Sequence, residues 1–413
     1  MKQLKFCFML LATCLLVACN SDDEATDQRL NLTTTFQLPS SIEGGTLKEL
    51  TLTFKELNTG RETTEQVPTV AGNQATVKLL KGEYEVRVVG KLNYKDKAGT
   101  AKESNISGRI ESFSLLNNDQ NVTIQLFIAG TENYEGFVLA EIFCAGSPTP
   151  KGKSYYADKY FVIYNNTDRV LYADSLVIAE SAFLTVMKHD YTPDIMATDF
   201  AVEAIYMVPG SGKDVPVKPG ERLLIVDNAI DHTKANPNSW NETTADFEWY
   251  DESTIPSISD IDNTAVKNLD RIYCYTKTIW TPHAQGFKSY ALARMKTTKD
   301  DYLTNYTYEY EYRVVGRTGA VDMKGKSYRI PNDWIIDAVN MSAPATYQWL
   351  VTSPELDQGY AYSSEMMGDK TAYGKSVRRK LFRKEGGRAI LQDTNNSSQD
   401  FEHRATANPF FKY

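Results

Sequence analysis

Four tyrosines at alternate positions carry the clearest binding chemistry in the sequence. They are Tyr306, Tyr308, Tyr310 and Tyr312. Alternate residues of a strand share one face, so the four rings would form a ladder with steps of about 7 Å. Such a ladder can stack flat ligands such as sugar rings, and its hydroxyls can donate hydrogen bonds. The alternative is that the rings pack on a hydrophobic core, as tyrosines in strands commonly do.

Histidine and serine patterns give no sign of an active site. The four histidines are scattered along the chain: His189, His232, His283 and His403. No HExxH-type metal pair and no G-x-S-x-G nucleophile turn occurs. An acid–base pair of His283 with Asp333 or Asp337 is conceivable, but turn or core roles are favoured for these residues. The sequence therefore predicts no catalytic residue and no enzyme.

Three acidic clusters offer the oxygen ligands that Ca²⁺ takes in proteins. They are Asp227 with Asp231, Asp260 with Asp262 and Asn263, and Asp393 with Asn395 and Asp400. None has the ligand spacing of an EF-hand loop, and residues of these types also make ordinary Asx turns. We therefore predict turns, with no metal and no cofactor.

A basic run lies near the end of the chain. It consists of Lys375, Arg378, Arg379, Lys380, Arg383 and Lys384. Such a run could meet an anionic lipid or glycan surface, but a solvated strand pair is favoured. Another stretch, Gly210-Ser211-Gly212-Lys213, is not a phosphate-binding loop, because Asp214 stands where that motif has Ser or Thr. It is predicted to be a turn.

The first residues direct the protein to a membrane. Residues 1–18 join a short basic start to an apolar run that is too short to span a bilayer, which is typical of a signal peptide. Leu16-Val17-Ala18-Cys19 resembles the lipobox of bacterial lipoproteins. This resemblance implies cleavage before Cys19 and attachment of lipid to its thiol, which would anchor the protein to the membrane. The alternative is a secreted protein that is cut after Ala18.

Residues 19–29 are expected to form an acidic tether. The cluster Asn20-Ser21-Asp22-Asp23-Glu24 resembles the export signals of Bacteroidota surface lipoproteins, which implies an outer-membrane lipoprotein exposed at the cell surface. A solvated tether without an export role is the alternative. No later segment is apolar enough to cross a membrane.

The net charge and the cysteine content limit the partners and the disulfide bonds that can be expected. The formal net charge of −8 becomes −10 when Lys2 and Lys5 leave with the signal. Because acidic residues outnumber basic ones, we do not expect a nucleic-acid partner. Besides Cys19, the mature chain keeps only Cys144 and Cys274, and whether these two form a disulfide stays open at this point.

Residues 30–129 alternate apolar and polar side chains, with turn residues at short intervals. About seven short strands in this length are typical of a β-sandwich. The stretch from Leu80 to Val88 resembles the "pGxYxVxV" hairpin of carboxypeptidase-regulatory-like and prealbumin-type domains. The resemblance implies a positive φ at Gly82 and three core-facing side chains, those of Tyr84, Val86 and Val88.

Residues 137–413 form a second all-β region that resembles a lamin-tail domain. The similar stretches begin at Glu141, Tyr160, Val217, Lys375 and Asp393, in the order of that family. They span far more than the roughly 100 residues of an Ig-like domain. An enlarged lamin-tail-like, Ig-like β-sandwich with an insertion at about 229–370 is therefore expected. Ala140 stands where the family has Asn, and the Trp of its "gw" turn is missing.

These features together predict an all-β cell-surface lipoprotein in which a β-sandwich raises a lamin-tail-like binding domain above the outer membrane. The expected role is non-enzymatic: capture of a glycan or other ligand, or support of a β-barrel transporter during nutrient uptake. One alternative is a hydrolase that acts on glycans or phosphoesters. The other is a structural protein of the envelope.

Overall fold

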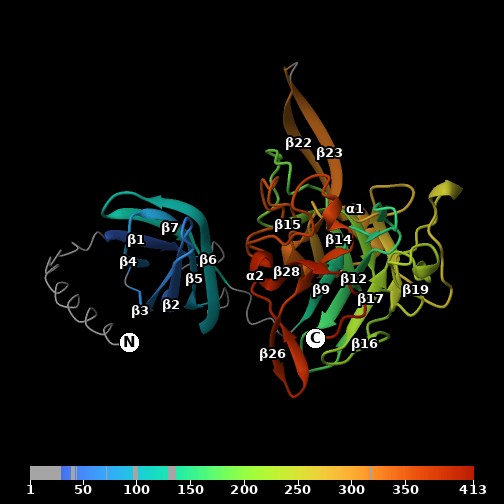
Figure 1. Ribbon diagram of the computed structural model, residues 1–413, viewed down its shortest axis with the longest axis horizontal. Helices are drawn as coiled ribbons and strands as arrows, with labels where there is room; N and C mark the ends of the chain where they lie inside the picture. The colour runs from blue at the N-terminus through green and yellow to red at the C-terminus, as the bar shows by residue number, and fades with distance from the viewer. Residues whose placement is uncertain are drawn as a thin grey trace, which may run out of the picture. The chain divides into compact units, whose positions relative to one another are not determined.

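The computed structural model describes residues 29–38, 42, 44–70, 72–95, 101–128, 136–316 and 319–413 (Figure 1). The predicted signal peptide of residues 1–18, the lipid-bearing Cys19 and the tether up to residue 28 lie outside the described residues. The chain divides into two compact units. Unit 1 comprises residues 1–103 and 107–126, and unit 2 comprises residues 104–106 and 127–413.

The described residues of unit 1 form seven strands. They are β1 (Leu30–Gln37), β2 (Thr46–Glu56), β3 (Glu62–Thr69), β4 (Gln74–Leu79), β5 (Gly82–Lys95), β6 (Ala101–Leu115) and β7 (Gln120–Gln125). One sheet has the order β4-β1-β7, and a second sheet carries β3, β2, β5 and β6 in that order. In β1 and β4 the buried side chains alternate with more exposed ones, and in β4 every second residue is buried. This period of two is the one expected for strands that bury a single face.

The stretch around Gly82 has the predicted buried side chains but not the predicted hairpin. Tyr84, Val86 and Val88 are buried, which confirms their core-facing side chains. The predicted hairpin and the positive φ at Gly82 are wrong: β4 pairs with β1, whereas β5 pairs with β2, so the chain crosses from one sheet to the other here. The Tyr84 hydroxyl donates to the carbonyl of Leu80 at 2.9 Å and ties this crossing to the core.

Unit 2 contains all the remaining elements. Its strands are β8 (Phe127–Ile128), β9 (Phe137–Phe143), β10 (Ser147–Pro148), β11 (Ser154–Tyr155), β12 (Tyr160–Asn165), β13 (Leu171–Tyr172), β14 (Leu176–Ser181), β15 (Asp199–Met207), β16 (Pro216–Val217), β17 (Arg222–Val226), β18 (Phe247–Glu248), β19 (Lys267–Asn268), β20 (Asp270–Cys274), β21 (Tyr290–Arg294), β22 (Thr307–Gly316), β23 (Gly319–Pro331), β24 (Ile335–Val339), β25 (Lys375–Arg379), β26 (Leu381–Glu385), β27 (Arg388–Leu391) and β28 (Phe401–Thr406). The α-helices are α1 (Lys299–Asn305) and α2 (Ser397–Asp400), and the 3-10 helices are η1 (His232–Lys234), η2 (Pro256–Ile258), η3 (Asn332–Trp334) and η4 (Lys370–Ala372).

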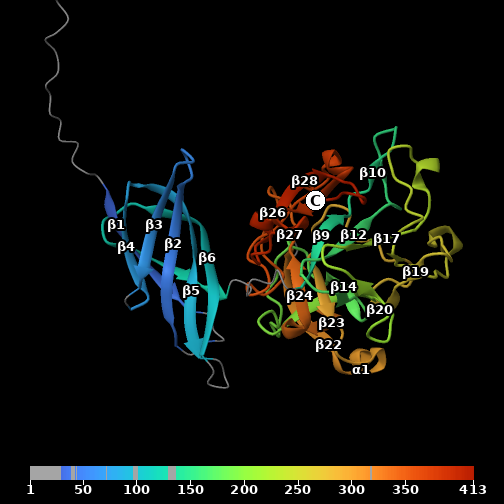
Figure 2. The ribbon, with the colours of Figure 1, turned by 90° about the horizontal axis from the view of Figure 1, so that it is seen from below.

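Two large sheets form the body of unit 2. The first, called the β12 sheet, has the order β19-β18-β17-β12-β9-β25-β28. The second, called the β15 sheet, has the order β22-β23-β15-β14-β21-β24, with β20 also paired to β15. In Figure 2, β9, β12 and β17 lie side by side, and their inner faces share one core with β14 and β21 of the other sheet. Segment 229–370 supplies strands to both sheets.

Both faces of the central strands are buried. In β12, Phe161 and Ile163 face the core between the sheets, whereas Tyr160, Val162 and Tyr164 belong to a second cluster on the outer face. Loops and the C-terminal segment cover that outer face. Because both faces are buried, the sequences of these strands are continuous apolar runs. Strands account for 48% of the chain and helices for 6%, which confirms the all-β sandwich class. No helix in the described ranges is long and apolar enough to cross a membrane.

Two arginines of the basic run are buried in ion pairs, so the predicted solvated strand pair is wrong for them. Arg378 binds the carboxylate of Glu141 through Nε at 2.9 Å and Nη2 at 3.1 Å. Arg379, whose side chain is 1% exposed, contacts three carboxylates, those of Asp337, Asp393 and Asp400. The neighbouring strand β26 is exposed throughout, as predicted.

Candidate functional site

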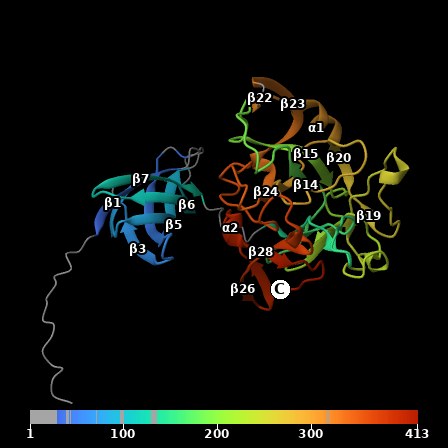
Figure 3. The same ribbon diagram turned by 45° about the horizontal axis from the view of Figure 1, so that its top comes forward.

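The tyrosine ladder lies on β22, at the edge of the β15 sheet. Helix α1 begins after Thr298, whose hydroxyl accepts from the Asp301 amide, and it ends at Tyr306. In Figure 3, α1 lies beside β23, and β22 and β23 form the long hairpin at the top of Figure 1. Because Tyr306 caps the helix instead of entering the strand, its ring stacks on Tyr302 at 5.2 Å. The ladder therefore consists of the other three tyrosines.

The ladder tyrosines differ in exposure along the strand. Tyr308 is buried, and its hydroxyl donates to the carbonyl of Pro193 at 2.7 Å. Tyr310 and Tyr312 are half-buried, and the ring centroids along the ladder are 5.0 and 6.1 Å apart. The two alternatives predicted from the sequence thus apply to different rings. Tyr308 packs in the hydrophobic core, whereas Tyr310 and Tyr312 keep part of their ring surface exposed to a ligand.

Gly325 on β23 makes room for the ring of Tyr310. The two residues are direct partners in the strand pair, and a Cβ atom at Gly325 would lie 2.3 Å from the Cζ atom of Tyr310. The aromatic ring therefore lies across bare backbone at this point, an arrangement known to rescue glycine in strands. On the outer edge of β22, Glu311 pairs with Thr192 through two backbone hydrogen bonds of 2.9 Å.

Three residues far away in the sequence complete what we call the aromatic surface, which consists of His189, Tyr191, Tyr310, Tyr312 and Trp349. All five side chains are half-buried. Tyr191 contacts Tyr310, Tyr312 and Trp349, with ring centroids 5.4, 5.2 and 5.9 Å apart, and it stacks on the buried Phe183. The sequence argument missed His189, Tyr191 and Trp349, because no periodic pattern connects them to β22.

The tyrosine hydroxyls of this surface are available to a ligand. Burial raises the pKa of Tyr191 and of Tyr310 above the ordinary tyrosine value. No hydrogen bond joins the hydroxyl of Tyr191, Tyr310 or Tyr312 to any other described residue, whereas Trp349 donates its indole N–H to the carbonyl of Leu184 at 2.8 Å. The surface can therefore stack a flat ligand and donate hydrogen bonds to it.

The other candidate pairs do not come together. The Asp337 carboxylate is held by Arg379, and Asp333 pairs with Lys296 at 3.1 Å, so neither faces His283 in an acid–base pair. Cys144 and Cys274 are both buried free thiols and form no disulfide. Among the described residues, no group of three or more His, Cys, Asp or Glu side chains could hold a metal ion.

The acidic clusters have structural roles. Asp231 accepts from the Thr233 amide and caps η1, as expected of an Asx turn, whereas Asp393 and Asp400 pair with Arg379. The segment from Gly210 to Lys213 is a loop, in agreement with the prediction. Its shape is fixed by the buried carboxylate of Asp174, which accepts amide hydrogens from Gly212 in this segment and from Asp214 and Val215 directly after it.

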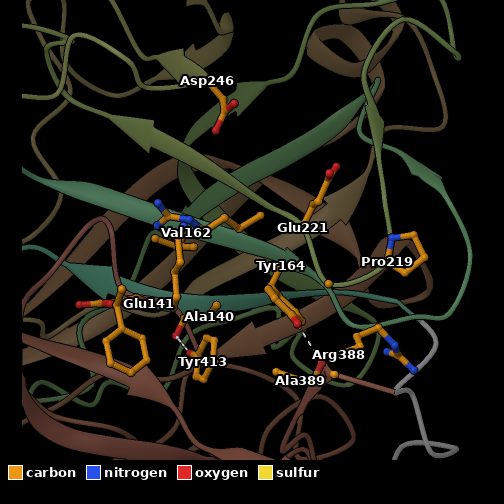
Figure 4. Close-up of a pocket in the computed structure, with 15 residues that line it drawn as sticks. Ala140, Glu141, Val162, Tyr164, Pro219, Glu221, Asp246, Arg388, Ala389 and Tyr413 are labelled. Carbon is orange, nitrogen blue, oxygen red and sulfur yellow. Dashed lines mark hydrogen bonds between the residues drawn. The ribbon is translucent and has the colours of Figure 1, made fainter. Parts of the chain in front are cut away.

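A groove of about 690 Å³ lies on the outer face of the β12 sheet (Figure 4). Its floor comes from central strands and includes Ala140 of β9 with Val162 and Tyr164 of β12. Loop 219–222, the β26–β27 turn and the last residues of the chain form its walls. The Tyr413 hydroxyl donates to the Ala140 carbonyl at 3.2 Å, which fixes the C-terminal segment to the sheet.

Glu141 lines the groove, and its carboxylate is bound by several neighbouring groups. Besides Arg378, its carboxylate accepts from the hydroxyls of Tyr160 and Ser376, both at 2.7 Å, and from the amide of Asn408 at 3.2 Å. These charge-assisted hydrogen bonds hold the carboxylate in one position. This residue carried part of the lamin-tail resemblance, and its observed role is to join β9, β12 and β25.

Comparison with known proteins gives one family match. Residues 218–408, which lie in unit 2, match the family model described as "Protein of unknown function (DUF4876)". A solved structure of a DUF4876 family protein from Bacteroides thetaiotaomicron is 21% identical, with a TM-score of 0.55 over 92% of this chain and 96% of that chain, which shows a shared fold. The major pilin of Streptococcus pyogenes, 8% identical over 74% of this chain and 94% of that chain, has a TM-score of only 0.12 and supports no argument. No curated protein matches the chain.

Proposed function

We propose that this protein is a lipid-anchored binding protein of the outer cell surface, and that its aromatic surface captures a glycan. One observation carries the proposal: Tyr191, Tyr310 and Tyr312 present half-buried rings whose hydroxyls have no partner among the described residues. Sugar rings have apolar faces that stack on aromatic side chains and hydroxyl groups that accept hydrogen bonds. The aromatic surface offers both types of contact side by side.

A lipid anchor and surface exposure are supported by the sequence at Cys19 and in the acidic cluster after it. A protein held in this way would present a bound glycan to a partner in the same membrane, and we propose a β-barrel transporter as that partner. The lamin-tail resemblance is part of the same proposal, since it suggests a binding domain. Nothing in the described residues favours a hydrolase or a purely structural envelope protein.

Binding to a glycan array, followed by titration of the best ligand, tests the role of the aromatic surface. Tyr312→Ala and Tyr310→Ala should each weaken binding roughly tenfold, because one aromatic contact contributes on the order of 1.5 kcal/mol. The matched control is Tyr308→Phe, which changes a buried ladder ring and should leave affinity unchanged. The proposal would lose its basis if Tyr310→Ala and Tyr312→Ala bound the glycan as tightly as Tyr308→Phe and the parent protein. It would also lose its basis if the parent protein bound no glycan.

Anchoring and partnership need separate experiments. Metabolic labelling with a fatty-acid analogue should mark the protein, and Cys19→Ala should abolish the label. Protease treatment of intact cells should degrade the protein if it is exposed. Affinity purification from detergent-solubilised outer membranes should recover a β-barrel protein, and repeated recovery of the protein alone would exclude a stable transporter complex.

A further inference from the structure

Arg222, in the groove on the β12 sheet, is a half-buried cation that forms no close ion pair with a described carboxylate. Its Nη1 atom donates to the carbonyl of Pro409, and its guanidinium lies 6.0 Å from the ring centre of Phe410. Burial lowers its pKa, and the more distant negative charges of Asp246 and Glu141 counteract this lowering only in part. Since a guanidinium has five N–H donors, most of its donor capacity is unused here.

Two more cations line the same groove. Arg388 donates through Nη1 to the carbonyl of Asn166 at 3.0 Å, and the nearest carboxylate, that of Glu385, is 3.8 Å away. Lys412 is exposed and forms no ion pair with a described residue. The groove thus gathers three positive charges that the protein itself compensates only weakly.

Acidic residues of the groove are already engaged or lie towards solvent. Glu141 is neutralised by Arg378, and Asp246 accepts from the Leu224 amide at 2.7 Å. Glu221 is exposed, accepts from the backbone amide of Lys218 at 3.0 Å, and forms an ion pair with the ammonium group of Lys218 at 3.4 Å. In Figure 4, the carboxylates of Glu221 and Asp246 lie on the side of the groove opposite Tyr413. A ligand that carries many negative charges would be repelled there, whereas hydroxyl groups could donate to these oxygens.

The position of the groove argues against a peptide ligand. Its floor consists of β9, β12 and β17, and each of these strands is paired on both sides in the seven-stranded sheet. The floor strands therefore offer no free edge at which a peptide could add backbone hydrogen bonds. The groove instead offers a flat apolar floor, aromatic side chains from Tyr164, Phe411 and Tyr413, and a volume in the range of small-molecule sites, roughly 300–1,000 Å³.

We propose that this groove binds an acidic saccharide, with the sugar carboxylate on the guanidinium of Arg222 and sugar hydroxyls on Asp246 and Glu221. An arginine fork matches a carboxylate in a bidentate geometry. The single negative charge of a uronate ring suits the unpaired cation, and its hydroxyls suit the acidic side of the groove. This site is independent of the aromatic surface, which lies on the other sheet.

Isothermal titration of the full protein with galacturonate, glucuronate and sialyllactose, each of which carries a single carboxylate, tests the proposal. We expect at least one of the three to bind with Kd below about 1 mM, and its carboxyl methyl ester to bind at least tenfold more weakly. Loss of affinity on esterification requires no protein variant, so it does not depend on how a mutant folds. If none of the three binds, or if the ester binds as tightly as the acid, the proposal is wrong.

Variants then locate the site. Arg222→Gln should weaken binding of the acid at least tenfold and leave binding of the ester unchanged. Arg383→Gln, at an exposed arginine of β26 that does not line the groove, is the matched control and should bind like the parent protein. Tyr310→Ala should also retain acid binding, which separates this site from the glycan site proposed above. Retention of acid binding by Arg222→Gln would overturn the assignment.

Discussion

Replacing Arg379 by methionine should destabilise unit 2 by about 3–5 kcal/mol, because it breaks a buried ion-pair network and leaves its partners uncompensated. The guanidinium of Arg379 lies 2.6, 3.2 and 3.7 Å from carboxylate oxygens of Asp337, Asp393 and Asp400. It also donates to the backbone carbonyls of Leu139 and Gln392, both at 3.0 Å. Methionine fills a similar volume but supplies no donor to any of these acceptors.

The loss of stability should depend on pH. Burial raises the pKa of Asp393 to about 7, and it also raises that of Asp337, even though Arg379 lowers both. A carboxyl whose pKa is higher in the folded state binds its proton there between about pH 4 and pH 7, so the free energy of unfolding falls as the pH rises through this range. Without Arg379 these pKa values rise further. The variant should therefore be destabilised more at pH 8 than at pH 5.

Tryptophan fluorescence during urea unfolding measures this effect selectively, because every tryptophan of the protein lies in unit 2. They are Trp240, Trp249, Trp280, Trp334 and Trp349. The control is Arg383→Met, at an arginine whose side chain is 45% exposed, which should change the unfolding free energy by only about 0.5 kcal/mol. If Arg379→Met costs no more than this control at pH 8, or costs the same at both pH values, the reasoning is refuted.

Two further predictions concern the cysteines and one loop. Cys144 and Cys274 should react with a thiol reagent only after unfolding, because both are buried and burial raises the pKa of Cys144 to about 12; rapid labelling of the folded protein would contradict this. Gly210→Ala should lower the melting temperature clearly more than Gly212→Ala: both glycines have positive φ, but only at Gly210 would the new Cβ meet a carboxylate oxygen, that of Asp174, at 2.1 Å. Equal melting temperatures of the two variants would show that this contact is relieved without cost.

The strands of unit 1 could be predicted from the sequence because a strand that buries one face has alternating apolar and polar residues. The alternation through Leu32, Thr34 and Phe36 corresponds to a buried face in the structure. The connection at Gly82 could not be predicted in the same way. Whether the next strand returns to the same sheet or crosses to the other depends on pairing with β2, and the local residues carry no information on that choice.

The candidate site could be predicted only as far as one strand extends. Period two placed Tyr308, Tyr310 and Tyr312 on one face correctly, but the capping of α1 removed Tyr306 from the ladder. Partners such as Trp349 come from segments that no local pattern links to β22. The same limit applies to the basic run, since adjacent arginines look alike in sequence, and only the positions of Glu141 and Asp337 in space reveal that Arg378 and Arg379 are buried.

The position of β9 in the sheet sets the order in which unit 2 can fold. This strand lies between β12, which follows it closely in the chain, and β25, which is separated from it by more than half of the protein. Glu141 of β9 receives its ion-pair partner Arg378 only when that distant strand docks. Such non-local pairing slows folding, because the chain loses the entropy of loop closure before the native contacts form. As the chain is synthesised, unit 1 can therefore fold once its own residues have emerged, whereas unit 2 must wait until β25 has emerged.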